Sequence, residues 1–313
     1  MYNTVMQLVY QNTIKNPVTI EGIGLHSGKP SKIRIVPSDL NQKIIFKRVD
    51  LQSNNLIEAN FKNVSSAKLC TTLENKHGVK VSTVEHLLAA IYISEIDSAV
   101  IEIDSEEVPI LDGSARDFLK ALKKSGLRTL NNKRKYLRLL NKVELLDGQR
   151  RINIMPLENS LEVDFQLNYQ NKLIGDQRNV VNFQTDGLED IVNSRTFCLF
   201  EDIEKIKKAG LAKGGSLENA LVVSNEKVMN EGGLRNAKEF VNHKILDLAG
   251  DFLLSGYRVT GKVICYQGGH QLSNMFLRKI LNTSNSFEIF TLKDSVVSKK
   301  INLNQQIKFA VSA

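Results

Sequence analysis

Two stretches, EHLLAAIYISEIDSAVIEI (85–103) and NHKILDLAGDFLLSGYRVTGKVI (242–264), indicate how this chain folds. Each begins with an apolar segment that has helical spacing, continues through a short break and ends in a β-type run. Each also carries one histidine in its helical part, His86 or His243. The shared plan predicts two related β-α-α-β units that pack together. A chance match stays open, because a helix followed by a strand is a common order.

The remaining periodic segments extend this plan to most of the chain. Strands are expected at Val18–Ile20, Lys32–Val36, Lys43–Phe46, Ala99–Ile103, Tyr136–Leu145, Arg151–Met155, Leu161–Leu167 and Val259–Tyr266. Helices are expected at Thr83–Tyr92, with Ser82 or Thr83 as N-cap, at Asp117–Leu127 and near Ala237–Leu254. The polar, basic stretch Thr129–Lys135 is expected to be a linker. The predicted class is therefore α+β, with domains at residues 1–130 and 136–313.

The composition is that of an ordinary globular protein, with 42% hydrophobic and 24% charged residues among 313. No apolar run reaches the roughly 18 residues that a membrane-spanning helix needs. The N-terminus lacks the basic and apolar regions of a secretory signal. Three widely spaced cysteines, Cys70, Cys198 and Cys265, are expected to be free thiols in a reducing compartment. Together these features predict a cytoplasmic protein.

The formal net charge of +8 suits an anionic partner, such as nucleic acid, lipid headgroups or a phosphorylated small molecule. Lysines scattered over a solvated surface would give the same charge. Neither an RNP-type aromatic pattern nor zinc-finger spacing is present, so nucleic acid has no specific support. The Gly-rich segment Leu211–Ser216 matches neither the P-loop nor the dinucleotide-binding pattern.

The helix expected near Ala237–Leu254 is mostly apolar but carries one narrow stripe of ionisable side chains. At about 100° per residue, this stripe contains His243, Lys244, Asp247 and Asp251. His243 and Asp247 are four residues apart, a spacing that can present two ligands to one metal ion. The alternative is a solvated face with an i,i+4 pair, although the rest of the helix is too apolar to lie half in water.

His86 points away from the apolar stripe of its own helix, where an ordinary core histidine would not lie. With His243 and Asp247 it would complete the ligand set of a catalytic zinc site with an open fourth position. Ferrous iron is an alternative metal for such a set. Glu85, beside one ligand, is a candidate base toward the attacking water. An exposed Glu-His pair is the alternative, and a structural zinc site is disfavoured because it usually has four protein ligands.

His270 follows Gly268 and Gly269 after an apolar strand. The glycines free the backbone to turn and to approach a ligand. A histidine in this place is either an acid/base group or an exposed loop residue, and the local sequence leaves both open.

Several short segments, spread over nearly the whole chain, form a recognisable series: Thr19–Gly28 (TIEGIGLHSG), Leu69–Thr72 (LCTT), Ser82–Ala90 (STVEHLLAA), Val108–Ala115 (VPILDGSA), Ser194–Phe197 (SRTF), Gly210–Ala220 (GLAKGGSLENA), Leu234–Gly256 (LRNAKEFVNHKILDLAGDFLLSG) and Gly268–Asn274 (GGHQLSN). Taken in this order, they resemble the UDP-3-O-acyl-N-acetylglucosamine deacetylases, the zinc amidases of lipid A biosynthesis. The resemblance implies removal of an N-acetyl group from an acylated UDP-N-acetylglucosamine, with release of acetate.

The resemblance also implies roles for single residues. Its metal ligands fall on His86, His243 and Asp247, its general base on Glu85, and its general acid on His270 with Asp251 as the orienting carboxylate. Lys244 and Thr196 match groups that stabilise the developing oxyanion. Phe197, Gly215, Ser216 and Cys70 match positions near the sugar, the nucleotide or the metal entrance, and His26 matches a histidine near the site with no fixed role.

The implied architecture is two β-α-α-β sandwich domains with the active site between them and a small insert in each. The second insert, near Ile206–Val222, would form an apolar passage for the acyl chain. A monomer with at most transient inner-membrane contact is expected, and no fused dehydratase domain. At Leu217–Glu218 and Ser94–Glu95 this sequence departs from the residues most common in the family. These differences leave the preferred acyl length open.

Two other functions remain as alternatives. One is a zinc amidase that acts on a different acetylated sugar. The other is a non-catalytic basic protein that binds RNA or nucleotide sugars, which predicts no bound zinc and an affinity for RNA that falls steeply with salt.

Overall fold

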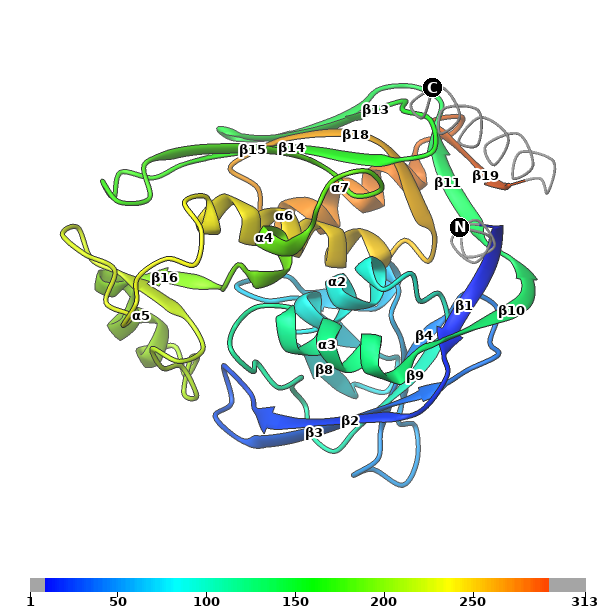
Figure 1. Cartoon of the computed structure of the whole chain (residues 1–313), viewed down its shortest axis with the longest axis horizontal. Coiled ribbons are helices and arrows are strands. Elements are labelled where there is room, and N and C mark those ends of the chain that lie inside the picture. The colour runs from blue at the N-terminus through cyan, green and yellow to red at the C-terminus, as the bar shows by residue number, and fades with distance from the viewer. Residues whose placement is uncertain (1–8, 293–313) are drawn as a thin grey trace, which may run out of the picture.

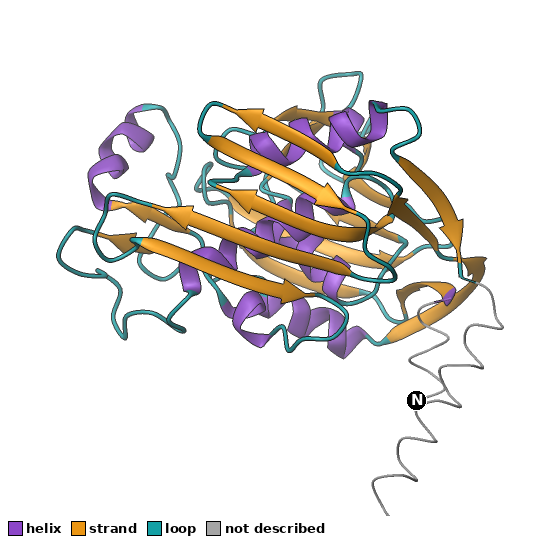
Figure 2. Ribbon diagram, turned by 90° about the horizontal axis from the view of Figure 1, so that it is seen from above, coloured by secondary structure: helices purple, strands orange, loops and turns teal. Residues whose placement is uncertain are grey.

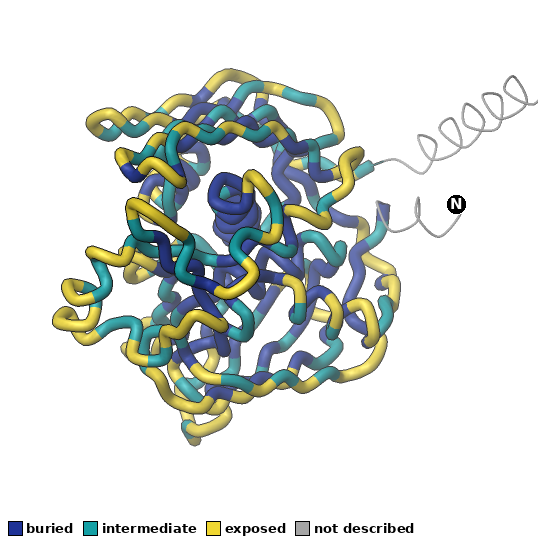
Figure 3. The backbone as a smooth tube through the Cα atoms, turned by 60° about the vertical axis from the view of Figure 1, so that its left-hand side comes forward, coloured by how far each residue is buried: buried dark blue, intermediate teal, exposed yellow. Residues whose placement is uncertain are grey.

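The computed structural model describes residues 9–292 and shows a mixed α/β fold, compatible with the predicted α+β class. Figure 1 shows two larger sheets on opposite sides of the molecule, with two layers of helices between them. The buried residues form a core that continues through both helix layers. In Figure 3, the buried segments run through the middle of the molecule and exposed segments lie around them.

The first large sheet belongs to the N-terminal half of the chain. Its strands, in spatial order, are β2 (Val18–Ile23), β3 (Pro30–Pro37), β9 (Ala99–Ile103), β4 (Ile44–Arg48) and β5 (Leu56–Glu58). β4 and β9 are parallel and the other pairs are antiparallel. Along β3, buried Ile33 and Ile35 alternate with exposed side chains, as expected for a strand with one face on the core.

A small antiparallel sheet interrupts this half before the helix that carries His86. It consists of β6 (Val64–Ser66), β7 (Thr72–Glu74) and β8 (Lys80–Ser82). The helix that follows is α2 (Glu85–Ile93), and the second helix of this half is α3 (Arg116–Ser125). Residues 85–92 are all buried, because α2 lies between α3 and the long helix α6 (Glu239–Leu253) of the other half.

The second large sheet contains strands from the C-terminal half, and Figure 2 shows them from above, laid over helices. The strands are β12 (Val143–Asp147), β13 (Arg150–Met155), β18 (Arg258–Tyr266), β11 (Lys135–Leu139), β19 (Phe287–Thr291), β14 (Leu161–Asn168) and β15 (Asp176–Asn182). β18 is the central strand, since it pairs with β11, β13 and β14.

The helices of this half are α4 (Glu189–Asn193), α5 (Ile203–Lys208), α6 (Glu239–Leu253) and α7 (His270–Asn282). In α6, every residue except Lys244 is buried. Two short 3-10 turns, η1 (Phe61–Asn63) and η2 (Phe200–Asp202), complete the helical segments. Within residues 9–292, no helix has both the length and the apolar character needed to cross a membrane.

Between α4 and α6 the chain forms a small protruding unit. Its two parallel strands are β16 (Phe197–Leu199) and β17 (Leu221–Val223), and η2 and α5 connect them. Figure 1 shows this unit extending away from the layered body. It contains the segment Ile206–Val222 that we expected to be an insert.

The prediction that Thr129–Lys135 is a linker without regular structure is wrong. Most of it lies in β10 (Leu127–Lys133), which pairs with β1 (Tyr10–Ile14) in a two-stranded sheet. The strand is polar because Leu130 is its one buried residue, so its sequence resembles a loop. The division into domains at residues 1–130 and 136–313 stays a prediction.

Two other predictions need correction. The single strand expected at Tyr136–Leu145 is two strands, β11 and β12. The helix expected to begin at Thr83 begins at Glu85, and its N-cap Val84 makes no side-chain cap bond. Thr83 instead adopts a left-handed φ of 56°, and its hydroxyl donates to the Glu107 carboxylate at 3.0 Å. The strand Ala99–Ile103 is confirmed with its predicted bounds.

Candidate active site

Helices α2 and α6 cross so that His86, His243 and Asp247 lie together. One ligand atom from each residue falls within 4.8 Å of the others, and all three side chains are buried. His243 Nε2 lies 3.3 Å and His86 Nε2 lies 3.5 Å from Asp247 Oδ1. The structure therefore brings together the three residues that the helix periodicity had selected.

The chemistry of these three groups fits a divalent metal ion. Within the described residues, Asp247 Oδ1 is buried without a hydrogen-bond donor. Burial would raise the pKa of Asp247, but the charged Lys244 and His270 beside it hold it well below its usual value, so the group is a carboxylate. Burial lowers the pKa of His243 to about 3, which leaves a neutral imidazole. Neutral imidazole and carboxylate are the ligand types of catalytic zinc.

Glu85, the first residue of α2, lies beside this group. Its Oε2 accepts a hydrogen bond from the Thr71 backbone N–H at 3.0 Å, and its Oε1 lies 3.6 Å from His270 Nε2. Burial raises the pKa of Glu85, while His270 and His86 oppose that shift. A carboxylate whose basicity is increased in this way suits a general base.

His270 is buried at the first turn of α7 and is oriented by Asp251. Its Nδ1 lies 3.0 Å from Asp251 Oδ2, and the Thr71 hydroxyl donates to Asp251 Oδ1 at 2.7 Å. Nδ1 donates a hydrogen bond to Asp251, and the other ring nitrogen, Nε2, faces Glu85 and Asp247. Burial would lower the pKa of His270, but Asp251, Glu85 and Asp247 raise it to about 10. The ring is therefore a proton donor.

Lys244 and Phe197 form one wall beside the three candidate metal ligands. Lys244 Nζ lies 2.9 Å from Asp247 Oδ2 and 5.5 Å from the centre of the Phe197 ring. Burial would lower the pKa of Lys244, but Asp247 raises it, so the ammonium stays charged. Thr196 lies next to Phe197, and its backbone N–H donates a hydrogen bond to the Gly113 carbonyl at 2.8 Å.

A cavity of about 320 Å³ opens onto these side chains. The predicted site residues that line it are His26, Glu85, His86, Thr196, Phe197, His243, Lys244, Asp247 and His270. Its wall also contains the apolar side chains of Leu25 and Leu69 and the cationic side chains of Lys68 and Arg150.

Four predicted site residues do not line this cavity. Asp251 contacts His270, which does line the cavity, with its Oδ2 3.0 Å from His270 Nδ1. Cys70 is buried, which raises the pKa of its thiol to about 12. Gly215 and Ser216 are exposed in the protruding unit, where the Ser216 backbone N–H donates to the Asn219 side chain at 2.8 Å.

His26 contacts the protruding unit from the first half of the chain. Its Nδ1 accepts from the Ala212 backbone N–H at 3.4 Å, and its carbonyl accepts from Lys213 at 3.2 Å. The Glu107 carboxylate accepts from the backbone N–H groups of His26 and Ser27, at 2.8 and 2.7 Å. The sequence analysis missed Glu107, although it directly precedes the VPILDGSA segment.

The sequence analysis also missed Thr71 and Glu239. Thr71 joins Glu85 to Asp251, and it lies within the LCTT segment that indicated the family. Glu239 is buried four residues before His243, on the same face of α6. An acidic residue one turn before a proposed ligand is the signal that could have found it.

Comparison with known proteins agrees with this geometry. The family model described as LpxC, UDP-3-O-acyl N-acetylglycosamine deacetylase, matches residues 11–282. Proteins named UDP-3-O-acyl-N-acetylglucosamine deacetylase are similar over almost their whole length. The protein from Haemophilus ducreyi is 36% identical over 291 residues, covering 92% of this chain and 95% of that protein. The protein from Pasteurella multocida is 38% identical over 290 residues, with coverage of 92% and 95%.

The corresponding protein from Vibrio cholerae is 37% identical over 294 residues, covering 93% of this chain and 96% of that protein. The family match and these relatives cover the residues of both helices that build the site. The chain therefore belongs to the LpxC family of UDP-3-O-acyl N-acetylglycosamine deacetylases, which are enzymes.

Proposed function

We propose that this chain removes the N-acetyl group from UDP-3-O-acyl-N-acetylglucosamine and releases acetate, as a step of lipid A biosynthesis. The observation that carries the proposal is the meeting of His86, His243 and Asp247 with Glu85 and His270 at one cavity. Family membership supplies the substrate class, because the relatives are named for this deacetylation.

His86, His243 and Asp247 would hold the metal, which we propose to be zinc, with ferrous iron as the alternative. Zinc in such a site supplies a Lewis acid and lowers the pKa of water toward about 7. The buried Asp247 Oδ1, without a donor among the described residues, supports the assignment.

Glu85 and His270 act as base and acid. Glu85 takes a proton from the attacking water as the acetamide carbonyl becomes tetrahedral. His270 then gives the proton at Nε2 to the leaving amine, which is a poor leaving group without it. Asp251 positions His270 by accepting a hydrogen bond from Nδ1, and the distance of 3.0 Å supports this role.

Lys244 and Thr196 stabilise the negative charge that develops on the carbonyl oxygen. Both line the cavity next to the ligands. Loss of one such donor typically lowers the rate about 100- to 1,000-fold. Removal of Lys244 would also leave the Asp247 carboxylate without its ammonium partner.

The rest of the cavity would bind the UDP-sugar. Lys68 and Arg150 provide cationic side chains for the diphosphate, and Phe197 provides an apolar surface for the sugar. We propose that His26 and Cys70 lie near the entrance. Gly215 and Ser216 would lie near the sugar or the nucleotide, and the segment Ile206–Val222 would form the acyl-chain passage in the protruding unit.

We further propose two β-α-α-β sandwich domains, at residues 1–130 and 136–313, with the site between them. The enzyme would act as a cytoplasmic monomer, with at most transient contact to the inner membrane and no nucleic-acid partner.

The test is acetate release from an acylated UDP-N-acetylglucosamine by metal-stripped protein, with and without added zinc. Asp247→Ala is the control that lacks one ligand. Activity that zinc restores only in the unmodified protein supports both the reaction and the metal site. Folded protein that is inactive with zinc and with ferrous iron would refute the proposal, and turnover of a substrate without the acyl chain would favour another acetylated sugar.

A further inference from the structure

The metal ligand His243 is held by a backbone carbonyl that lies in a dense polar cluster. His243 Nδ1 lies 3.1 Å from the Ser194 carbonyl oxygen, which can only accept, so Nδ1 carries the proton. The other nitrogen, Nε2, is then unprotonated and faces Asp247. A hydrogen bond of this kind fixes both the tautomer and the orientation of a ligating imidazole.

Arg195, the residue after Ser194, binds the same face of helix α6 through Glu239. The Arg195 guanidinium donates from Nε to Glu239 Oε1 at 2.7 Å and from Nη2 to Glu239 Oε2 at 3.2 Å. The Arg195 backbone N–H donates to Oε1 at 3.1 Å. Because Glu239 and His243 are four residues apart on α6, Ser194 and Arg195 bind two adjacent positions of one helix face.

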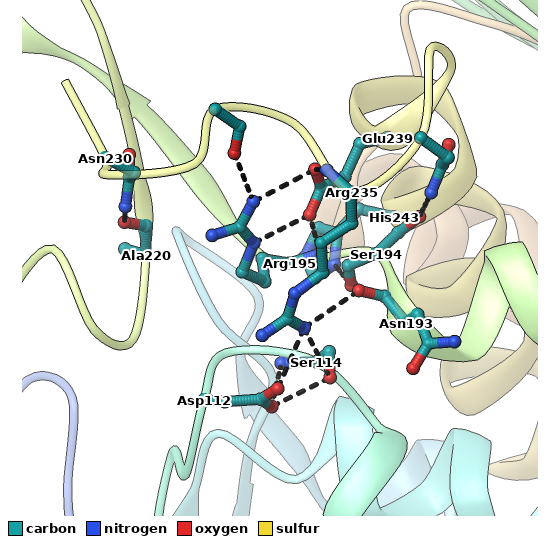
Figure 4. Close-up of polar contacts among 12 residues, drawn as sticks. Asp112, Ser114, Asn193, Ser194, Arg195, Ala220, Asn230, Arg235, Glu239 and His243 are labelled. Atoms are coloured by element: carbon teal, nitrogen blue, oxygen red, sulfur yellow. Dashed lines mark hydrogen bonds and ion pairs between the residues drawn. The ribbon is translucent and has the colours of Figure 1, made fainter. Parts of the chain in front are cut away.

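Both members of this ion pair are enclosed by the protein. The side chains of Arg195 and Glu239 are 9% and 0% exposed, and Nη2 of Arg195 also donates to the Gly233 carbonyl at 2.8 Å. The Arg235 backbone N–H donates to Glu239 Oε2 at 2.6 Å. Figure 4 shows these contacts converging on Glu239. Burying two charges is costly, so such a pair gives weak evidence for stability and calls for another explanation.

Arg235 connects this cluster to the N-terminal half of the chain. Its guanidinium lies 2.8 Å from Asp112 Oδ2 and donates to the Asn193 carbonyl at 3.0 Å (Figure 4). The Asp112 carboxylate in turn accepts from the Ser114 hydroxyl at 2.7 Å. Residues 193–195 are therefore held from both sides, and the Ser194 carbonyl has little freedom to leave His243.

We propose that the Arg195–Glu239 ion pair is a positioning device for the metal ligand His243, which it orients by holding the Ser194 carbonyl against Nδ1. The inference rests on the proposed metal site. Arg195 and Glu239 do not line the cavity, so they act through the ring of His243 and not on the substrate.

The test compares metal affinity with stability. In the double variant Arg195→Met/Glu239→Met both charges are removed, so no unpaired charge is left buried. Three quantities are measured: the zinc dissociation constant by competition with a chelator, the absorption spectrum of the cobalt-substituted protein, and the thermal unfolding midpoint of metal-free protein.

The dissociation constant should rise about 10- to 100-fold, as is typical when the partner of a ligating histidine is disturbed. The cobalt spectrum should change as well, because the His243 ring is no longer held in one orientation. A merely structural pair would lower the unfolding midpoint and leave the zinc affinity and the spectrum of the folded protein unchanged.

Glu239→Gln is the second variant, for the case that the double variant does not fold. It keeps the shape and one acceptor oxygen but loses the charge, so a smaller rise in the zinc dissociation constant is expected. The control is Arg178→Met. It breaks the bidentate ion pair that Arg178 on β15 makes with Asp164 on β14, and it should leave zinc binding unchanged.

Zinc affinities of both variants that equal the wild-type value would overturn the inference. Failure of the unmodified protein to bind zinc would be a different result, because it would refute the proposed metal site itself.

Discussion

Gly250 on α6 is the position where one added methyl group should disturb the site most directly. A Cβ at residue 250 would lie 2.1 Å from the Glu85 carbonyl oxygen and 3.1 Å from the Ala89 nitrogen. Real Cβ atoms essentially never approach another heavy atom within 3.0 Å, so α2 and α6 must separate locally by about 0.9 Å. The part of α2 that would move contains Glu85, the proposed base, and the next residue, His86.

The structure and helix propensity predict opposite effects of Gly250→Ala on stability. In a helix interior, alanine is favoured over glycine by about 1 kcal/mol. Overpacking a buried contact costs about 1–3 kcal/mol, so we expect a net loss of roughly 0–2 kcal/mol in the free energy of unfolding. The effect on turnover should be larger, since a misplacement of about 1 Å can cost on the order of 100-fold in rate.

The assay is kcat/KM for acetate release at saturating zinc, with urea unfolding of the same samples. Gly187→Ala is the matched control, because a Cβ there would meet no heavy atom within 4 Å. Wild-type turnover in Gly250→Ala, together with equal or higher stability, would show that the close contact between the helices does not determine the placement of Glu85.

Two further predictions concern the acid/base groups and a buried ion pair. Glu85→Gln and His270→Ala should each lower kcat on the order of 100- to 10,000-fold while zinc content, measured by atomic absorption, stays at the wild-type level. Zinc loss from the His270 variant would instead identify that residue as a ligand. Arg134→Met removes a guanidinium that lies 2.7 Å from Asp97, with both side chains buried. Because Arg258 still faces Asp97 at 3.2 Å, the loss in urea unfolding should stay below the roughly 3–5 kcal/mol expected for a buried charge without any partner. An unchanged unfolding midpoint would contradict that reasoning.

The grouping of the proposed ligands could be predicted because its signals are local. His243 and Asp247 lie on one helix, and a spacing of four residues determines that they are neighbours. His86 was found through the mismatch between its polar side chain and an otherwise apolar helix. The depth of burial was not predictable in the same way, because it depends on α2 and α6 packing against each other at Gly250.

The predictions that were wrong or missed have a common physical cause: the structure at these residues depends on contacts with residues far away in the sequence. β10 pairs with β1, at the other end of the first half, so its polar sequence alone indicated a linker. The helix α7 was missed although Leu272, Phe276 and Ile280 are buried at helical spacing, because the preceding glycines suggested a loop. The role of Thr71 depends on its contact with Asp251, 180 positions further along the chain.

The charges at the site also imply that a divalent metal ion, if bound there as proposed, and the fold would stabilise each other. Glu85, Asp247 and Asp251 are buried close together, and the cations that face them are His270 and Lys244. Burial raises the pKa of Glu85, which shows that the charged form is costly there. A divalent cation would offset that cost in the folded state.

An ion that binds only the folded state stabilises it by about 2.7 kcal/mol at 100 times its dissociation constant. Zinc should therefore raise the unfolding midpoint of the unmodified protein and have little effect on Asp247→Ala, as measured by scanning calorimetry. The Asp247→Ala control matters because unfolded chains also bind zinc through histidine and cysteine, which would lower both midpoints. Equal responses of the two proteins would mean that the ion binds elsewhere, and that the buried carboxylates are stabilised by His270 and Lys244 without it.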